Sequence, residues 1–359
     1  MNKVLFIRRD NIGDLICTTP AIHALREKFP AAKIGILVNS YNADVVAGNP
    51  DIDEVYVYEK AKHAKGQSRL LVWLRNLRLL LKIRGERYDV EIGCGNYSPS
   101  LARYTLLTGD KNRIGYVRSG DRSISYNIPI SELREPIHEV VATFKLLEPL
   151  GISGEPSNLV LLPSADEKEK VLKFLFPHPT PDTDIRGQAS HIPPPVFVAM
   201  HISSRKENNR WPTNRFIELG NELIKRYNIM PLILWAPGSS KNPFHPGDDE
   251  KAEAIAKRMF IKPALYKTVN LKELIAAISM CKLVICCDGG AMHIAAALGK
   301  PILAIWGSTD RRRWAPWKTE NIILQKGHTA DEVSVEAAIG AFETLWQTAV
   351  SKAGGYKCH

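Results

Sequence analysis

Short apolar runs alternate with amphipathic segments from the start of the chain to about residue 150. The apolar runs are rich in β-branched residues, as buried strands are, and the segments between them have helical spacing. Strands that alternate with helices predict a parallel sheet with helices on both faces. The expected strands are 4–7, 33–38 and 90–93, and the expected helices begin at Thr19-Pro20, within 60–87 and at His138.

A second series of the same kind begins at residue 196 and predicts a second doubly wound domain. Its expected strands are 196–201, 230–235, 282–287 and 302–306, and its expected helices are 213–227, 249–259, 271–280 and 291–298. A last apolar helix, 333–350, is expected to cross back to the first domain and to be followed by a frayed tail.

The two series are separated by a segment, 177–195, that is rich in Pro, Asp, Thr and Ser and is predicted to be a mobile surface loop. The length of 359 residues also exceeds what one hydrophobic core usually holds. We therefore expect an α/β protein with a first domain over 1–165, a linker over 166–195 and a second domain over 196–332. The terminal helix and tail occupy 333–359.

Composition narrows the class of protein. The chain contains no apolar run long enough to span a membrane, and its start lacks the apolar region and cleavage site of a signal peptide, so a cytoplasmic location is expected. The six cysteines are scattered, without the paired spacing of a zinc site. Buried, reduced thiols are predicted, and for Cys286 and Cys287 a place in the strand core is favoured over a redox role.

Positive charge is concentrated in one segment of a chain whose net charge is +10. Between residues 60 and 87 there are nine lysines and arginines against one acid, interleaved with leucines, which predicts a helix with one apolar and one cationic side. An anionic partner is indicated, although a solvated helix face would give the same pattern. Nucleic acid is less favoured because no known nucleic-acid module accompanies the charge.

The stretch 281–310 reads as strand, glycine turn, helix, strand and polar loop. A helix that begins after a glycine turn at the end of a parallel strand directs free backbone N–H groups at an anion, typically a phosphate. The turn is Asp288-Gly289-Gly290, and ordinary structural punctuation is the alternative. His293, one turn into this helix, is expected to face a ligand rather than only to pack.

Polar residues follow two other strands of the second series. Ser203, Ser204, Arg205 and Lys206 come after the strand 196–201, and Ser308, Thr309 and Asp310 come before three arginines, 311–313. Hydroxyls, cations and glycine amides at successive strand ends suit a diphosphate.

Asp14 lies on a glycine turn just after the first strand, where a general base would face the crevice between two α/β domains. A helix-capping aspartate is the alternative. The glycine pattern GxGxxG is absent here and at the second glycine turn, so no dinucleotide fingerprint is present.

Taken in order, these motifs resemble one known family. The chain is similar to the ADP-heptose:lipopolysaccharide heptosyltransferases, glycosyltransferase family 9, of the GT-B fold. The motifs that carry the resemblance are Gly13-Asp14 with Thr19-Pro20-Ala21, His138-Glu139-Val140, Arg210-Trp211-Pro212, Asp288-Gly289-Gly290-Ala291-Met292-His293, and Pro301 with Gly307-Ser308-Thr309-Asp310.

The resemblance implies two Rossmann-like domains facing a central cleft and an inverting, metal-independent sugar transfer with Asp14 as the catalytic base. No DxD pair stands at a strand end of the second domain to suggest a metal, and no cofactor beyond the nucleotide sugar is expected. By the same resemblance the donor is bound by Ser203, Ser204, Lys206, Arg210, Glu250, Val269, Asp288, Gly289, Gly290, His293 and Thr309. An anionic glycolipid at the cytoplasmic face of the inner membrane is the expected acceptor, bound by Arg9, Lys60, Lys62, Lys65 and Arg69.

Two positions depart from the family pattern. Asn209 stands where the family usually has a lysine, so Arg205, Lys206 or Arg210 would supply the charge, and Gly289 replaces a serine or threonine. A transferase of the same fold for another nucleotide sugar or acceptor is therefore the first alternative. A non-catalytic protein that binds nucleotide sugars or anionic glycans is the second, although such a binder has no need of a base at Asp14.

Overall fold

The computed structural model describes residues 1–59, 68–109, 111–118, 124–132, 135–177, 196–242 and 247–351. The chain divides into two compact units. Unit 1 comprises Met1–Leu162 and Asp310–Trp317, and unit 2 comprises Pro163–Thr309 and Lys318–His359. Each unit contains one six-stranded sheet in which every strand pairing is parallel.

The sheet of unit 1 has the strand order β3-β2-β1-β4-β5-β6. Its strands are β1 (Lys3–Ile7), β2 (Lys33–Asn39), β3 (Glu54–Tyr58), β4 (Val90–Gly93), β5 (Asn112–Val117) and β6 (Ile128–Ser131). The direction in which the chain adds strands reverses between β1 and β4. At such a switch point the carboxyl ends of the two central strands leave a crevice in which α/β proteins bind ligands.

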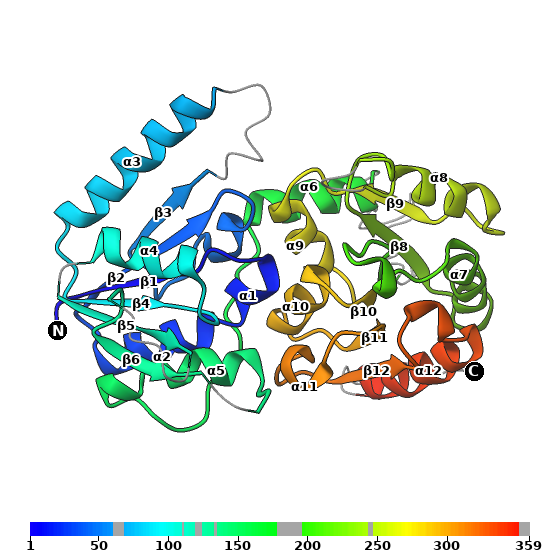
Figure 1. Ribbon diagram of the computed structural model, residues 1–359. Coiled ribbons are helices and arrows are strands. Elements are labelled where there is room, and N and C mark those ends of the chain that lie inside the picture. Colours follow the sequence, from blue (N-terminus) through cyan, green and yellow to red (C-terminus); the bar gives the residue numbers. More distant parts are fainter. Residues whose placement is uncertain are drawn as a thin grey trace, which may run out of the picture. The chain divides into compact units, whose positions relative to one another are not determined.

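Helices cover both faces of this sheet, with α3 and α4 on one face and α2 and α5 on the other (Figure 1). The helices of unit 1 are α1 (Ile12–Ile16), α2 (Thr19–Lys28), α3 (Arg69–Gly85), α4 (Pro99–Thr108), α5 (Glu139–Lys145) and α11 (Arg311–Trp314). Because both faces are covered, strand β1 is apolar after Lys3, and Val4, Leu5, Phe6 and Ile7 are all fully buried.

Unit 2 repeats the same topology, with the order β12-β11-β10-β7-β8-β9. Its strands are β7 (Phe197–His201), β8 (Met230–Trp235), β9 (Ala264–Lys267), β10 (Leu283–Cys287), β11 (Ile302–Trp306) and β12 (Asn321–Gln325). Its helices are α6 (Ala165–Leu175), α7 (Thr213–Tyr227), α8 (Asp249–Arg258), α9 (Leu271–Ser279), α10 (Gly290–Ala297) and α12 (Val335–Ser351). The switch point here lies between β7 and β10, so the predicted fold class of two Rossmann-like α/β units is confirmed.

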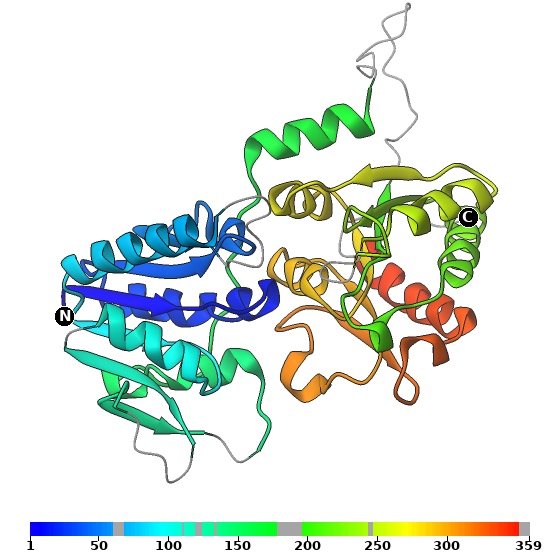
Figure 2. The same ribbon diagram turned by 45° about the horizontal axis from the view of Figure 1, so that its top comes forward.

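Three parts of the predicted domain organisation differ from the structure. The segment Asp310–Trp317, expected in the second domain, belongs to unit 1. The terminal helix α12 does not return to the first domain: Phe342 and Trp346 are buried in the core of unit 2 together with strands β7, β10 and β11. The segment expected to be a linker begins with α6, which packs against α9 in unit 2, as Figure 2 shows. The rest of that segment, 178–195, lies outside the described residues.

Two further expectations can be compared with the structure. The cysteines that it describes, Cys17, Cys94, Cys281, Cys286 and Cys287, are buried and form no disulfide, as predicted, and Cys358 lies outside the described residues. Within the described parts of the chain, no helix combines the length and apolar character needed to cross a bilayer.

Candidate active site

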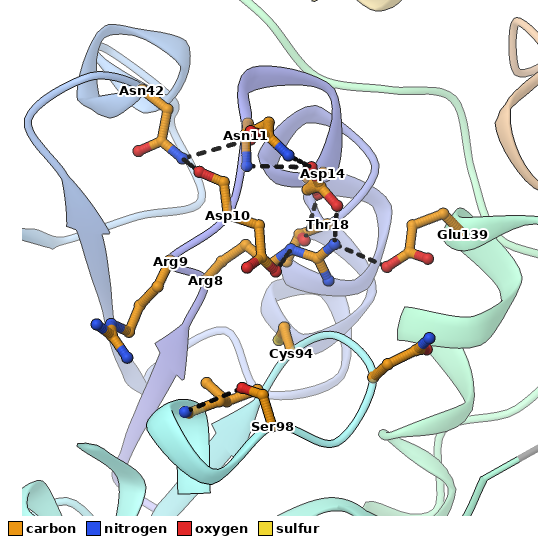
Figure 3. Close-up of polar contacts among 12 residues, drawn as sticks. Arg8, Arg9, Asp10, Asn11, Asp14, Thr18, Asn42, Cys94, Ser98 and Glu139 are labelled. Carbon is orange, nitrogen blue, oxygen red and sulfur yellow. Dashed lines mark hydrogen bonds and ion pairs between the residues drawn. The ribbon is translucent and has the colours of Figure 1, made fainter. Parts of the chain in front are cut away.

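Asp14 lies in α1, the short helix that follows the carboxyl end of β1 (Figure 3). One of its oxygens, Oδ2, accepts hydrogen bonds from the backbone N and the side-chain Nδ2 of Asn11, both at 3.0 Å, and so caps the start of the helix. The other oxygen, Oδ1, accepts a bond of 2.9 Å from Nη2 of Arg8. The capping role considered from the sequence is therefore real, and it occupies only one side of the carboxylate.

Arg8 is the centre of a buried network of charges. Its side chain is 1% exposed, and its Nη2 also donates to Oε1 of Glu139, equally buried, at 2.7 Å. Glu139 opens α5, and its Oε2 accepts from Nε and Nη2 of Arg313 at 3.0 and 2.6 Å. A buried charge is tolerated when it is paired and hydrogen-bonded in this way. Helix α5, strand β1 and helix α11 are thereby held together around Asp14.

This network fixes the ionisation of Asp14. Burial favours the protonated carboxyl, but the charge of Arg8 and the hydrogen bonds from Asn11 and Arg8 outweigh it, so the pKa of Asp14 is lowered. Burial likewise opposes the charge of Arg8, and the carboxylates of Glu139, Asp14 and Asp10 overcome it and raise the pKa of Arg8. At neutral pH Asp14 is therefore a carboxylate, able to accept a proton.

The residues predicted to bind the acceptor have different surroundings. Arg9 donates to Oγ of Ser100 at 2.8 Å, and its guanidinium lies over the rings of Tyr104 and Tyr58, 3.5 and 4.8 Å from their centroids. Arg69 is exposed at the start of α3. Lys60, Lys62 and Lys65 lie outside the described residues. The role of this group stays a prediction.

In unit 2 the two serines after β7 tie neighbouring strand ends together. Ser203 Oγ accepts from the backbone N of Ala236, after β8, at 2.9 Å. Ser204 Oγ donates to the backbone oxygen of Asp288, after β10, at 3.1 Å. Both serines are buried, so the carboxyl edge of the sheet is held in one arrangement around the switch point.

Asp288 is the polar centre of this edge. Its Oδ2 accepts from Nδ2 of the buried Asn209 at 2.7 Å, and the same amide group donates to Oγ1 of Thr309 at 3.1 Å. Lys206 Nζ reaches that hydroxyl at 3.4 Å. Burial raises the pKa of Asp288, against the opposing effects of Thr309, Lys206, Asn209 and Arg205. A buried carboxylate with a perturbed pKa at a switch point marks a candidate binding site.

The candidate cations in this region are not equivalent. Arg210 donates from Nε to the backbone oxygen of Ser204 at 2.8 Å and so supports the serine loop. Lys206 is exposed and directed to the Thr309 hydroxyl, and its charge acts on Asp288. Of the two, Lys206 is the cation placed beside the polar centre.

The glycine turn adopts the geometry that its sequence implies. Gly289 has φ +154° at the start of α10, a conformation that side-chain-bearing residues rarely adopt, and no described atom lies within 4 Å of where its Cβ would stand. The space around Gly289 would therefore accommodate the serine or threonine of the family pattern, but the positive φ of this position disfavours either residue. Gly290 is the first residue of α10, and His293 is buried within that helix.

Glu250 and Val269 lie near the end of β8 rather than in the Asp288 cluster. Glu250, in the first turn of α8, accepts from Oγ of Ser239 at 2.7 Å. Val269 is exposed, and its neighbour Thr268 donates to the backbone oxygen of Trp235, the last residue of β8, at 3.0 Å. Because β8 pairs with β7, both residues belong to the same edge of the sheet as Ser203.

The sequence grouped the arginines after Thr309 with the diphosphate ligands, but two of them have carboxylate partners in the structure. Arg312 pairs with Asp310 at 2.9 Å, and Arg313 binds Glu139 in unit 1. Sequence reasoning also did not single out Arg8, Glu139 and Asn209 as partners of the site carboxylates. For Arg8, the sequence did contain one signal of such a role, because it is a charged residue directly at the end of an apolar strand.

No group of three or more His, Cys, Asp and Glu side chains in the described parts of the chain is arranged to hold a metal ion.

Comparison with known proteins gives a consistent set of relatives. The family model described as "Glycosyltransferase family 9 (heptosyltransferase)" matches residues 76–338. "Lipooligosaccharide heptosyltransferase 2" of Haemophilus influenzae is 31% identical over 338 residues, which cover 90% of this chain and 88% of the relative. "Lipopolysaccharide heptosyltransferase 3" of Escherichia coli K12 is 26% identical over 323 residues, with coverages of 87% and 84%.

Solved structures agree on the fold. A glycosyltransferase family 9 protein from Veillonella parvula superposes with a TM-score of 0.81 at 22% identity, covering 97% of this chain and 98% of its own. An E. coli heptosyltransferase solved with ADP gives a TM-score of 0.74 at 17% identity, with coverages of 96% and 99%. These similarities confirm the GT-B architecture expected from the sequence.

Proposed function

Because the chain belongs to glycosyltransferase family 9, the heptosyltransferases, and is therefore a glycosyltransferase, we propose that it transfers a heptose from ADP-heptose to a lipopolysaccharide core acceptor with inversion at the anomeric carbon. Relatives named as lipopolysaccharide and lipooligosaccharide heptosyltransferases support the donor and acceptor class. The observation that carries the chemistry is the ionised carboxylate of Asp14, held by Arg8 at the switch point of unit 1.

The reaction is a single displacement. The acceptor hydroxyl gives its proton to Asp14, and its oxygen forms the new bond to the anomeric carbon of the heptose. The bond between that carbon and the β-phosphate oxygen breaks, and its electron pair leaves on ADP. Asp14 is a weak base, so proton transfer proceeds as the hydroxyl oxygen becomes bonded and acidic.

Arg8 positions the base and balances charge during this step. It fixes Oδ1 of Asp14 through Nη2, and the same nitrogen is bonded to Glu139. When Asp14 gains the proton, Arg8 keeps a carboxylate partner in Glu139. The buried guanidinium is therefore never left without a counter-charge, which would be costly in the interior.

Charge on the leaving diphosphate needs stabilisation, and unit 2 offers the groups for it. We assign this role to Lys206, to the hydroxyls of Ser204 and Thr309, and to the N-terminal amides of α10. Fixed cations and helix amides can each lower the barrier by a few kcal/mol in a closed site. The transfer is accordingly proposed to need no metal ion and no cofactor apart from the donor.

The acceptor is proposed to be an anionic glycolipid at the cytoplasmic face of the inner membrane. Arg9 and Arg69 in the described residues, and the lysines at 60, 62 and 65, are the cations assigned to it. Phosphate groups of such a lipid are recognised by arginine and lysine through charge-assisted hydrogen bonds.

The test is Asp14→Asn in an assay with ADP-heptose and a lipopolysaccharide core acceptor, with Asp10→Asn as the control. Asp10 lies just before α1 and also faces Arg8, at 3.5 Å, but its side chain is half exposed. Losing the general base should lower kcat by about 10²- to 10⁴-fold, with ADP affinity unchanged. Asp10→Asn should keep most of the turnover.

The pH dependence provides a second readout. Because the folded pKa of Asp14 lies below its ordinary value, the base stays ionised as pH falls to where an ordinary aspartate begins to protonate, and kcat/KM should lose this group only at lower pH. Full turnover by Asp14→Asn would show that another group takes the proton. Retained ADP binding without transfer in the wild-type protein would favour the non-catalytic binder.

A further inference from the structure

Helix α3 exposes large apolar side chains. The sequence predicted a helix with one apolar and one cationic side, and of its residues, all of which the structure describes, only Val72 and Ile83 are buried. Leu70, Trp73 and Leu81 are 63%, 58% and 60% exposed. Exposed apolar surface of this size on one element marks an interaction site.

Four of the five exposed leucines of α3 form a single stripe, and Leu71 lies beside it. Leu70, Leu74, Leu77 and Leu81 follow one another at spacings of four, three and four residues, which places them on one face of a helix with 3.6 residues per turn. Val72 and Ile83 lie on the opposite face, and Ile83 packs into the core beneath β1, β2 and β3. In Figures 1 and 2 the described elements lie against one side of α3 only.

The stripe is bordered by cations and an aromatic ring. Arg78 and Arg84 lie beside the leucines, one on each side, Trp73 lies next to them, and residues 69–85 contain no acid. Arg75 and Lys82 lie nearer the sheet side of the helix, where they pair with Glu59 and Glu54 at 3.3 and 3.1 Å. Leucine and tryptophan on one face with lysine and arginine at its borders is the composition of helices that lie in a membrane interface. Anionic headgroups complement such borders, whereas an apolar groove of a protein gives the cations no partner.

We propose that the stripe Leu70, Leu74, Leu77 and Leu81 of α3 docks the enzyme on an anionic bilayer surface, with Trp73 at headgroup depth and Arg78 and Arg84 on lipid phosphates. The proposal goes beyond the sugar transfer, because it concerns the lipid matrix and not the acceptor. It stands or fails independently of the identity of the donor.

A second copy of this chain is the competing occupant, because the same spacing occurs in coiled coils. With these leucines at the seam, the flanking positions would be Leu71, Trp73, Arg78 and Leu80, and Leu80 already packs against the core of unit 1. Because residues 69–85 contain no acid, a second copy of α3 would give Arg78 no partner of opposite charge. The bilayer is therefore favoured over self-association.

The experiment is cosedimentation of the full chain with vesicles of phosphatidylethanolamine and phosphatidylglycerol that contain no glycolipid, with phosphatidylcholine vesicles as the neutral comparison. The wild-type protein should sediment with the anionic vesicles and much less with the neutral ones. The double variant Leu70→Glu/Leu81→Glu should bind at least about tenfold more weakly. Its matched control is Phe260→Glu/Ile261→Glu, which changes two exposed apolar residues of unit 2 and should bind like the wild type.

Charge is tested by Arg78→Glu against Lys326→Glu, an equal change on an exposed loop of unit 2. Reversing the charge of Arg78 should weaken binding to the anionic vesicles about fivefold or more, and a higher salt concentration should also weaken it. Unfolding temperatures show that each variant folds. Wild-type protein left in the supernatant, or unchanged binding by Leu70→Glu/Leu81→Glu, would overturn the proposal, as would a dimer in solution that this variant dissociates.

Discussion

At the residue scale, the departure at Asn209 receives a structural account. The Asn209 amide is buried and bonds both Asp288 and Thr309, so it organises the polar centre of unit 2 but brings no charge. Lys206 reaches the same Thr309 hydroxyl from the exposed side. The sequence offered Arg205, Lys206 and Arg210 as candidate cations, and the contacts of the last two distinguish Lys206, directed to Thr309, from Arg210, bonded to the Ser204 backbone.

We predict that Lys206→Ala weakens ADP binding about tenfold, because it removes a charge-assisted contact of roughly 1.5 kcal/mol at an exposed position. The unfolding temperature should not change. Arg210→Ala, the comparison variant, should lower the unfolding temperature because Ser204 loses its hydrogen-bond donor. Titration calorimetry with ADP and thermal unfolding of both variants provide the measurements. Wild-type ADP affinity in Lys206→Ala would exclude this lysine as a diphosphate ligand.

The sequence could place Asp14 and Asp288 but not their partners. A carboxylate after a glycine turn at a strand end is a local pattern, readable from neighbouring positions. Glu139 stands 131 positions from Arg8, and Arg313 a further 174 from Glu139, so their ion pairs depend on how helices pack. Side-chain partners across such separations leave no trace in local spacing.

At the scale of elements, the sequence predicted the central strands and missed those toward the edges. Strands β1, β2, β7, β8, β10 and β11 were located because they are buried on both faces and read as continuous apolar runs. Strands β3, β6, β9 and β12 end the two sheets, and partly exposed residues interrupt their apolar pattern. Edge position therefore explains these four omissions. Strand β5, an interior strand that was also missed, begins with Asn112 and Arg113 and contains Gly115, so it does not read as a continuous apolar run.

The terminal helix shows a different limit of sequence reasoning. Its periodic apolar pattern predicted a helix, and α12 confirms that, but periodicity does not say which core the apolar face joins. In the structure Phe342 packs against Tyr227 of α7 and stacks on Trp346, with ring centroids 5.3 and 5.5 Å apart. The helix completes unit 2.

Phe342→Ala should therefore destabilise unit 2 by about 3–5 kcal/mol, as expected for a fully buried phenylalanine. Hydrogen exchange should accelerate in β11, β12 and α7 and remain unchanged in β1 and β4. Phe260→Ala, at a side chain that is 86% exposed, is the control and should leave exchange unaltered. Faster exchange in unit 1 with unit 2 protected would mean that α12 belongs to the other core.

At the scale of the whole molecule, two sheets of identical strand order present their polar residues at equivalent places. Asp14 and Arg8 follow the central strand β1, and Ser203 and Ser204 follow its counterpart β7. The rule that ligands bind at the carboxyl ends beside a switch point thus applies once in each unit. Base and donor ligands are assigned to different units, which is why the sequence showed two separate series of motifs.

Ligand-dependent stability tests the donor assignment on the intact chain. A ligand that binds only the folded state stabilises it by mass action, by about 2.7 kcal/mol when its concentration is a hundredfold above Kd. For a unit of this size that raises the unfolding temperature by roughly 5 °C or more.

We expect ADP and ADP-heptose to produce this shift, in EDTA as in magnesium, and UDP, GDP and NAD to produce little. A shift that requires magnesium would contradict metal-independent binding of the diphosphate, whereas a response to UDP or GDP instead of ADP would point to the transferase of another nucleotide sugar. Asp14→Asn should show the same ADP shift as the wild type, because the base is assigned to unit 1 and the nucleotide ligands to unit 2.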